Sequence, residues 1–157
     1  INRAKNTHLL IEAFCKMNIH NTHLLIFGSA DKQMTLELET YKGNKNITFA
    51  GWIKSDAAYD IFLAGDLVCF PGTHSVLWEQ AVACGVPGIY KLWEGMKHIN
   101  VNGNAILLEE CTTDSIQRCI ECIINDSHTY SRMKENATNA MSSFYYNEIA
   151  RKAIEHI

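Results

Sequence analysis

Two hydroxyl side chains and a carboxylate lie close together in the segment FPGTHSVLWEQAVACGVP, residues 70–87. Thr73 and Ser75 directly follow a Pro-Gly pair, and Glu79 comes one helical turn after Ser75. Backbone amides and hydroxyls at the beginning of a helix stabilise an anion such as phosphate. A carboxylate one turn further along does not bind the anion, but it accepts hydrogen bonds from hydroxyl groups. The spacing therefore predicts a site for a phosphate beside a hydroxylated ring such as ribose.

The geometry expected for this site has Ser75 as the N-cap of a helix that a glycine closes. The next three amides, beginning with that of Val76, then have no partner within the helix and are free to donate to a ligand. Gly72 allows the loop backbone to approach another backbone segment closely. The alternative is that Thr73 and Ser75 are only helix caps and that Glu79 is a solvated helix residue.

The elements that would position these residues alternate between strand and helix patterns. Short apolar runs predict strands at 22–28, 46–53, 67–70, 87–91 and 104–109. Helical periodicity predicts helices at 5–17, 32–42, 55–65, 75–85, 113–124, 127–143 and 146–157. Continuous apolar strands are typical of a parallel sheet that is covered on both faces. The expected fold is α/β: a doubly wound, Rossmann-like parallel sheet with helices on both faces and a C-terminal helical tail, forming a single domain over 1–157.

Ligands of such sheets bind beyond the carboxyl ends of the strands. The first helix is expected to be capped by Asn6 or Thr7, and the third by Ser55 or Asp56. The predicted strand ends are 28–29, 51–53, 71–75 and 91–95. The opening segment is one of these ends, and the residues up to His98 are expected to flank the same site.

Composition sets limits on the class of protein. The chain has 157 residues, 47% hydrophobic and 20% charged, with a net charge of −3 and no basic block, which argues against nucleic acid as a partner. Cys119 and Cys122 form a C-x-x-C pair inside a helical pattern with no second pair, so reduced thiols of a cytoplasmic protein are expected. The histidines show no metal-ligand spacing. The first residues, INRAKNTH, are interpreted as part of a longer protein.

The segment DLVCFPGTHSVLWEQAVACGVPGI, residues 66–89, resembles the C-terminal, donor-binding domain of the group 1, family 4-like glycosyltransferases of the GT-B fold. Its end, EQAVACGVPGI, is similar to the family's EAMACGVPVI. Four further pieces resemble family segments in the same order: AKNTHLLIEAF, LLIFGSAD, NITFAGWI and NGNAILLE. Together they cover the chain from about residue 4 to about residue 109. The resemblance implies a two-domain enzyme whose N-terminal, acceptor-binding domain is absent here.

The resemblance also implies roles for individual residues. Lys5 matches a lysine that contacts the donor diphosphate, and Arg3 corresponds to an arginine with the same role. Glu79 matches the glutamate that binds the ribose. The remaining donor-binding residues implied by the matched segments are Gly28, Ser29, Gly51, Trp52, Ile53, Thr73, His74, Ser75 and Val76. Of these, 51–53 correspond to a nucleobase contact, and 73–76 to the loop that holds phosphate and sugar.

One position departs from the family pattern. The family often has another glutamate eight residues before the ribose-binding one, where it contacts the donor sugar. Pro71 occupies that position here, and His74 is the candidate to take over the sugar contact. The identity of the sugar is therefore not indicated by the sequence.

The function that the resemblance implies is sugar transfer from a nucleoside diphosphate sugar in polysaccharide, capsule or lipopolysaccharide synthesis. The expected partners are the nucleotide sugar and an acceptor glycan or lipid-linked sugar, and the expected location is the cytoplasm, including peripheral association with the inner face of the membrane. No catalytic residue is assigned, and no cofactor or metal is expected, since no Asp-x-Asp triplet occurs. A non-hydrolysing sugar-nucleotide epimerase domain and a non-catalytic nucleotide-binding α/β module are the alternatives.

Overall fold

The computed structural model describes residues 1–17 and 19–155. The strands are β1 (Leu24–Phe27), β2 (Ile47–Gly51), β3 (Val68–Phe70), β4 (Gly88–Lys91) and β5 (Ala105–Leu108). The helices are α1 (Thr7–Lys16), α2 (Lys32–Leu38), α3 (Ala57–Ala64), α4 (Leu77–Ala83), α5 (Thr113–Asn125), α6 (Ser127–Ala140) and α7 (Tyr146–Glu155). Short 3-10 turns lie at Arg3–Lys5, Glu39–Tyr41, Lys97–Ile99 and Met141–Phe144. Each predicted strand and helix is present, with ends shifted by a few residues.

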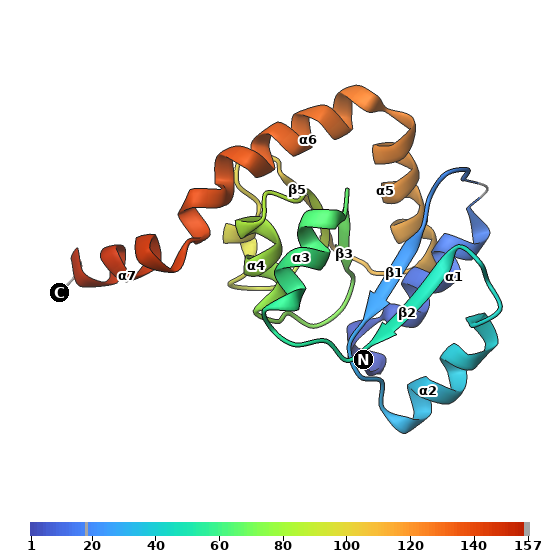
Figure 1. Ribbon diagram of the computed structural model, residues 1–157. Helices are drawn as coiled ribbons and strands as arrows, with labels where there is room; N and C mark the ends of the chain where they lie inside the picture. The colour runs from blue at the N-terminus through green and yellow to red at the C-terminus, as the bar shows by residue number, and fades with distance from the viewer. Residues whose placement is uncertain (18, 156–157) are drawn as a thin grey trace.

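The strands form two parallel sheets rather than one continuous sheet (Figure 1). β1 pairs with β2, and β4 lies between β3 and β5. The predicted α/β class with a helical tail is therefore confirmed, but the expectation of a single sheet is wrong in one respect. Among residues 1–17 and 19–155 no strand connects β1 to β3, and a cavity lies between these two strands.

The three-stranded sheet is covered on both faces because neighbouring residues of β4 point in opposite directions. Ile89 is fully buried against α1 and α5, where it packs in a cluster with Leu10 and Ile116. Tyr90 is fully buried on the opposite face, in a cluster with Trp78 of α4. The ring centroids of Tyr90 and Trp78 are 5.2 Å apart. This arrangement is the doubly wound packing that the apolar strands predicted.

The two-stranded sheet is covered less completely. On one face, Ile26 of β1 and Ile47 of β2 pack against α1 and against Met34 of α2. Toward α3, the ring of Phe27 lies edge-on to that of Phe62, with centroids 5.8 Å apart. Leu25 remains 41% exposed. Only part of β1 is therefore shielded from solvent.

The two predicted helix caps have different outcomes. Asp56 caps α3, since its carboxylate accepts a hydrogen bond from the amide of Ala57. Asn6 occupies the N-cap position of α1 in a left-handed conformation (φ 53°), but its side chain does not cap the helix. Instead Asn6 Nδ2 donates to the carbonyl oxygen of Pro71, at 2.9 Å. The side chain predicted to cap α1 thus ties the beginning of this helix to the loop that follows β3.

The helical tail consists of α5, α6 and α7. α5 packs against α1, and α6 crosses the molecule to reach α4 (Figure 1). α7 extends away from the other elements, and none of its described residues is buried. Residues 156–157 of the predicted last helix lie outside the described residues. None of the helices described is long and apolar enough to cross a membrane.

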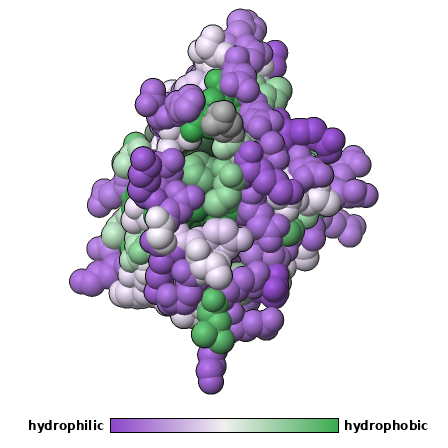
Figure 2. All heavy atoms as spheres, turned by 90° about the vertical axis from the view of Figure 1, so that its right-hand side faces the viewer, coloured by the Kyte–Doolittle hydropathy of each residue, from purple (hydrophilic) through white to green (hydrophobic). Residues whose placement is uncertain are grey.

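The surface is mainly hydrophilic on the side shown in Figure 2. Hydrophobic side chains gather there in a hollow near the middle of the view and in a small group at its lower end. This distribution fits a domain whose apolar residues are gathered mainly between the helices and the sheets.

Candidate functional site

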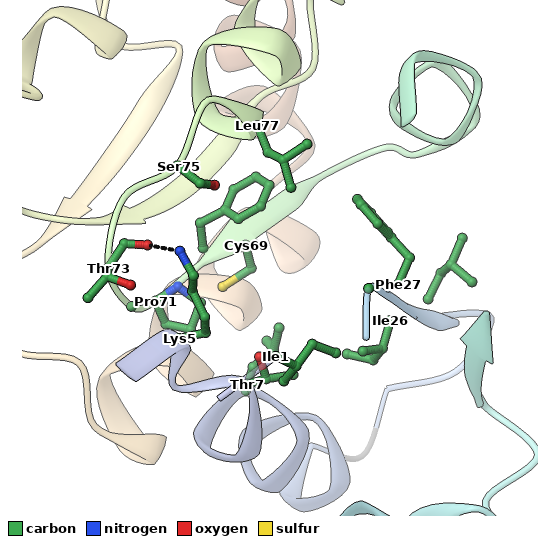
Figure 3. Close-up of a pocket in the computed structure, with 15 residues that line it drawn as sticks. Ile1, Lys5, Thr7, Ile26, Phe27, Cys69, Pro71, Thr73, Ser75 and Leu77 are labelled. Carbon is green, nitrogen blue, oxygen red and sulfur yellow. Dashed lines mark hydrogen bonds between the residues drawn. The ribbon is translucent and has the colours of Figure 1, made fainter. Parts of the chain in front are cut away.

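A cavity of about 220 Å³ separates the two sheets at the carboxyl ends of β1 and β3. Residues 25–28 line it on the β1 side and residues 69–73 on the β3 side, with Ser75 and Leu77 beyond them. Lys5 and Thr7 close it from the beginning of α1 (Figure 3). Of the four strand ends that the sequence predicts to border a ligand site, those at 28–29 and 71–75 contribute residues to this cavity, and those at 51–53 and 91–95 do not.

The loop after β3 lies directly against the backbone at the beginning of the chain. The amide of Thr73 donates to the carbonyl oxygen of Ala4, at 2.8 Å. A Cβ atom on Gly72 would clash with the carbonyl oxygen of Ala4 and with the backbone of Lys5. A residue with a side chain does not fit there without a shift of the backbone. The predicted close backbone approach at Gly72 is confirmed.

Lys5 is the cation at the mouth of this cavity. Its Nζ donates to the carbonyl oxygens of Thr73 (2.9 Å) and His74 (3.1 Å), as the dashed line to Thr73 in Figure 3 illustrates. An ammonium group has three N–H donors, so one donor remains for a ligand. Partial burial lowers the pKa of Lys5 from its usual value of 10.5, because a desolvated ammonium is less stable.

The expected capping of α4 by Ser75 is wrong. The helix begins at Leu77, its N-cap position is taken by Val76, and no side chain caps it. The amide of Trp78, expected to be free, donates to the carbonyl oxygen of Ser75 at 3.0 Å. The physical reason is that Val76 already has helical dihedral angles (φ −54°, ψ −20°) and that the fully buried indole of Trp78 fixes the first turn.

Glu79 lies in the first turn of α4 and faces His98. Its Oε1 is 3.6 Å from His98 Nε2, and His98 Nδ1 is 3.2 Å from the carbonyl oxygen of Gly95. The second oxygen of Glu79, Oε2, is buried and has no hydrogen-bond partner among residues 1–17 and 19–155. The carboxylate therefore keeps unmet capacity to accept a hydrogen bond. Sequence reasoning did not identify His98 individually, and only its place after β4 could have indicated it.

The segment after β4 lies beside the loop after β3, as predicted. The ring of His74 is 5.6 Å from that of Trp93 and lies edge-on to Trp78 at 6.3 Å. Lys91 Nζ lies 5.3 Å from the centroid of the Trp93 ring, a cation–π contact. The side chain of His74 is thus placed by aromatic neighbours on the side of Trp93.

The carboxyl ends of β1 and β2 form a second, smaller cavity. It measures about 160 Å³, and Gly28, Ser29 and Gly51 are among the residues that line it. The amide of Gly28 donates to the carbonyl oxygen of Gly51 at 2.7 Å, which holds the two strand ends together. Gly28 lines both cavities.

Eight predicted site residues do not line the main cavity. Ser29 and Gly51 line the second cavity, and His74 and Glu79 contact Trp93 and His98. The other four lie elsewhere. Arg3 pairs with Glu37 at 2.8 Å, on the side of α2. Trp52 is 69% exposed and Val76 is 62% exposed. Ile53 packs against the cluster formed by α3 and α4. The cavity itself gathers Lys5, Gly28, Thr73 and Ser75.

The cysteines and the metal-ligating residues show no assembled centre in the described part of the chain. Residues 1–17 and 19–155 contain no group of three or more His, Cys, Asp or Glu side chains that is arranged to hold a metal ion. All six cysteines are free thiols. Burial raises the pKa of the Cys119 thiol, which keeps it protonated and weakly reactive.

Comparison with known sequences identifies one family. Residues 1–140 match the family described as "Glycosyl transferases group 1". No curated protein sequence matches the chain.

Three solved structures illustrate the structural similarity. HepE from Anabaena, solved with UDP and glucose, is 20% identical, with a TM-score of 0.77 over 99% of this chain and 45% of that chain. Sucrose-phosphate synthase from Thermosynechococcus elongatus is 18% identical, with a TM-score of 0.80 over 98% of this chain and 41% of that chain. The C-terminal domain of LpcC, a group 1 glycosyl transferase from Francisella tularensis, is 19% identical, with a TM-score of 0.69 over 91% of this chain and 80% of that chain.

The coverages show that HepE and sucrose-phosphate synthase are longer than this chain. The chain spans less than half the length of HepE and of sucrose-phosphate synthase. Identities of 18–20% support a common fold.

Proposed function

Because the chain belongs to the glycosyl transferases of group 1, we propose that it is the donor-binding domain of a two-domain sugar transferase. In this proposal residues 1–157 hold a nucleoside diphosphate sugar, and a separate N-terminal domain binds the acceptor. The observation that carries the proposal is the Lys5 ammonium, which two loop carbonyls hold at the mouth of the cavity.

Lys5 would meet the charge of the diphosphate. Its remaining N–H donor lies beside the loop at 73–75, where the hydroxyls of Thr73 and Ser75 also line the cavity. As the glycosidic bond breaks, negative charge grows on the leaving diphosphate, and a fixed cation stabilises that charge. The stabilisation comes from Lys5 and the loop, and it does not require Ser75 to cap α4. Metal-free binding of the diphosphate remains a prediction.

Glu79 would bind the ribose hydroxyls. Support comes from the unmet hydrogen-bonding capacity of its Oε2 and from its place in the first turn of α4, behind the loop. His98 would orient the carboxylate through the contact with Oε1. The nucleobase would lie toward Gly51 and the second cavity, where the ends of β1 and β2 meet.

The finer parts of the proposal concern the donor, the acceptor and the location. The donor is proposed to be a UDP-sugar, since UDP is bound in the HepE structure. The acceptor is proposed to be a growing glycan or a lipid-linked sugar of polysaccharide or lipopolysaccharide synthesis. The reaction would then take place in the cytoplasm or at the inner face of the membrane.

Calorimetric titration with UDP, GDP and ADP tests the proposal. We expect UDP to bind, and we expect Lys5→Met and Glu79→Gln each to weaken binding about 10- to 100-fold, as for loss of a hydrogen bond to a charged group. The matched controls are Lys45→Met and Glu135→Gln, which alter exposed residues. Equal affinity of the site variants and the controls, or no heat with any nucleotide at millimolar concentration, would contradict the proposal.

A further inference from the structure

A second lysine lies beside the loop that follows β3. In the parallel pair of β3 and β4, Phe70 is the partner of Tyr90. The next residues of the two strands, Pro71 and Lys91, therefore follow as neighbours at the carboxyl edge of the sheet. Pro71 is also tied to the beginning of α1, because Asn6 Nδ2 donates to its carbonyl oxygen at 2.9 Å. Lys91 and the beginning of α1 thus both lie next to Pro71.

Lys91 and Lys5 differ in what holds their ammonium groups. Lys5 lines the main cavity, and its Nζ donates to two loop carbonyls (Figure 3). Lys91 does not line that cavity, and its Nζ lies 5.3 Å from the centroid of the Trp93 ring. In the part of the chain that the structure describes, Lys91 makes no ion pair. A cation–π contact leaves the N–H donors of an ammonium available, so Lys91 can still bind an anion.

Aromatic side chains accompany this ammonium. Trp93 is half-buried, and its ring is tilted by 47° to that of His74, with the centroids 5.6 Å apart. Sites for small molecules combine such aromatic surface with a few polar groups that fix the orientation of the ligand. The face of an indole ring suits the C–H groups of a sugar, while an ammonium suits a charged substituent. We call His74, Lys91 and Trp93 the Lys91 surface.

The strand order indicates which part of a donor meets the Lys91 surface. Under the proposed function the diphosphate lies at Lys5, and the nucleobase lies toward the ends of β1 and β2. The sugar of a nucleoside diphosphate sugar is attached to the phosphate that is farther from the nucleoside. β4 lies on the far side of β3 from the first sheet. The sugar therefore extends past the loop after β3 toward the end of β4.

We infer, on the basis of the proposed function, that the transferred sugar carries a carboxylate, as a hexuronic acid does. Lys91 pairs with this carboxylate, and Trp93 contacts the sugar ring. A neutral hexose at the same place removes water from the ammonium without supplying a partner, which is unfavourable. The Lys91 surface therefore favours a uronic acid over a neutral hexose, and Lys91 acts as a specificity-determining residue.

The diphosphate is the other anion that Lys91 could meet. It has closer partners, because Lys5, Thr73 and Ser75 all line the main cavity and Lys91 does not. The two assignments also differ in their consequences. Loss of a lysine that binds the diphosphate weakens every nucleotide equally, whereas loss of one that binds a uronic acid weakens only the donor with the carboxylate.

Calorimetric titration with UDP, UDP-glucose and UDP-glucuronic acid tests the inference. We expect UDP-glucuronic acid to bind at least about fivefold more tightly than UDP-glucose, as for one ion pair at a half-exposed site. Lys91→Gln should abolish this difference, and Lys91→Arg should retain part of it. The matched control is Lys97→Gln, which removes the charge of an exposed lysine after β4 and should leave the full difference.

The outcomes separate the inference from the proposed function. Absence of UDP binding contradicts the proposed function, and the inference falls with it. Binding of UDP with equal affinity for the two sugar nucleotides overturns the inference alone, as does an equal loss for all three ligands in Lys91→Gln or an equal effect of Lys97→Gln.

A second measurement covers the case in which Lys91→Gln does not fold. The affinities of the unaltered chain for the two sugar nucleotides are then compared at about 0.05 M and about 0.5 M salt, because salt screens an exposed ion pair. The preference for UDP-glucuronic acid should decrease at the higher concentration. A preference that does not decrease would overturn the pairing with Lys91.

Discussion

β1 and β4 are apolar parallel strands of equal length, four residues each, yet their surroundings differ. β4 has a strand on each side and helices on both faces, and Gly88, Ile89 and Tyr90 are all buried. β1 has one paired edge, and Ile26 is its only buried residue. The amino-acid pattern of a strand therefore does not determine its burial, because burial depends on which neighbours are present.

The comparison also indicates which half of the domain contributes more to its stability. β3, β4 and β5 form the well-covered half, while β1 and β2 form the half that is covered less completely. The candidate site lies at the boundary, where Lys5 and the loop after β3 connect the two halves. A ligand bound there contacts both halves, so binding should stabilise the more weakly covered one.

The sharpest test of this difference in burial between β4 and β1 compares two substitutions that shorten a side chain. Ile89→Ala should lower the free energy of unfolding by about 2–5 kcal/mol, because it leaves a cavity beside a fully buried side chain of β4. Leu25→Ala should lower it by about 1 kcal/mol or less, since Leu25 is 41% exposed. Urea unfolding measures both values. Equal losses in the two variants would show that the halves are equally important for stability.

The contact between the halves depends on Gly72. Gly72→Ala should lower the free energy of unfolding by about 1–3 kcal/mol, because the new methyl group overlaps the backbone of Ala4 and Lys5. Gly43→Ala is the matched control, since a methyl group at Gly43 meets no atom within 4 Å. Thermal unfolding of the two variants provides the measurement, and a Gly72→Ala protein as stable as the control would disprove the close approach.

The contact between Glu79 and His98 joins two elements of the well-covered half. If His98 orients the carboxylate for ribose, His98→Ala should weaken UDP binding about 3- to 10-fold, equivalent to about 1 kcal/mol. His98→Gln should recover part of the loss, because its amide can donate to Glu79. His128→Ala, at an exposed position on α6, serves as the control. Unchanged affinity in His98→Ala would remove this residue from the site.

The smallest expected effect concerns pH. Because burial lowers the pKa of Lys5 below 10.5, the native chain releases this proton at a pH where the unfolded chain still holds it. Stability should therefore rise with pH in the window below 10.5, while affinity for UDP should fall in the same window as the ammonium loses its charge. Lys5→Met should abolish both trends. Parallel changes of stability and affinity in the unaltered protein would contradict this assignment.

Much of the fold follows from local sequence signals. The alternation of apolar runs and helical periods predicts every strand and helix described, and Gly72 and Asp56 behave as their residue types predict. The separation of β1 from β3 could not be predicted. The apolar pattern of each strand indicates that it is buried, but it does not indicate with which other strand it pairs. The start of α4 was misplaced because the burial of Trp78, rather than a cap by Ser75, sets its first turn.

The site was predictable only in part, because contacts between distant parts of the sequence are not encoded in local patterns. Lys5 and Thr73 are far apart in the sequence, and family resemblance, not spacing, pointed to Lys5. The structure adds the hydrogen bond between them at 2.9 Å. His98 contacts Glu79 across two different elements, and no local pattern encodes that pairing. Arg3 was expected near the diphosphate, but its pairing with Glu37 across the chain directs it to α2.

The most direct test of the central claim is an NMR titration of the chain with UDP and, separately, with uridine. If the diphosphate binds where the two sheets meet, UDP should shift the amide signals of Lys5 and of residues 72–75, and uridine at the same concentration should leave them unchanged. Shifts confined to other regions, such as α6 and α7, or identical shifts with both compounds, would contradict the claim.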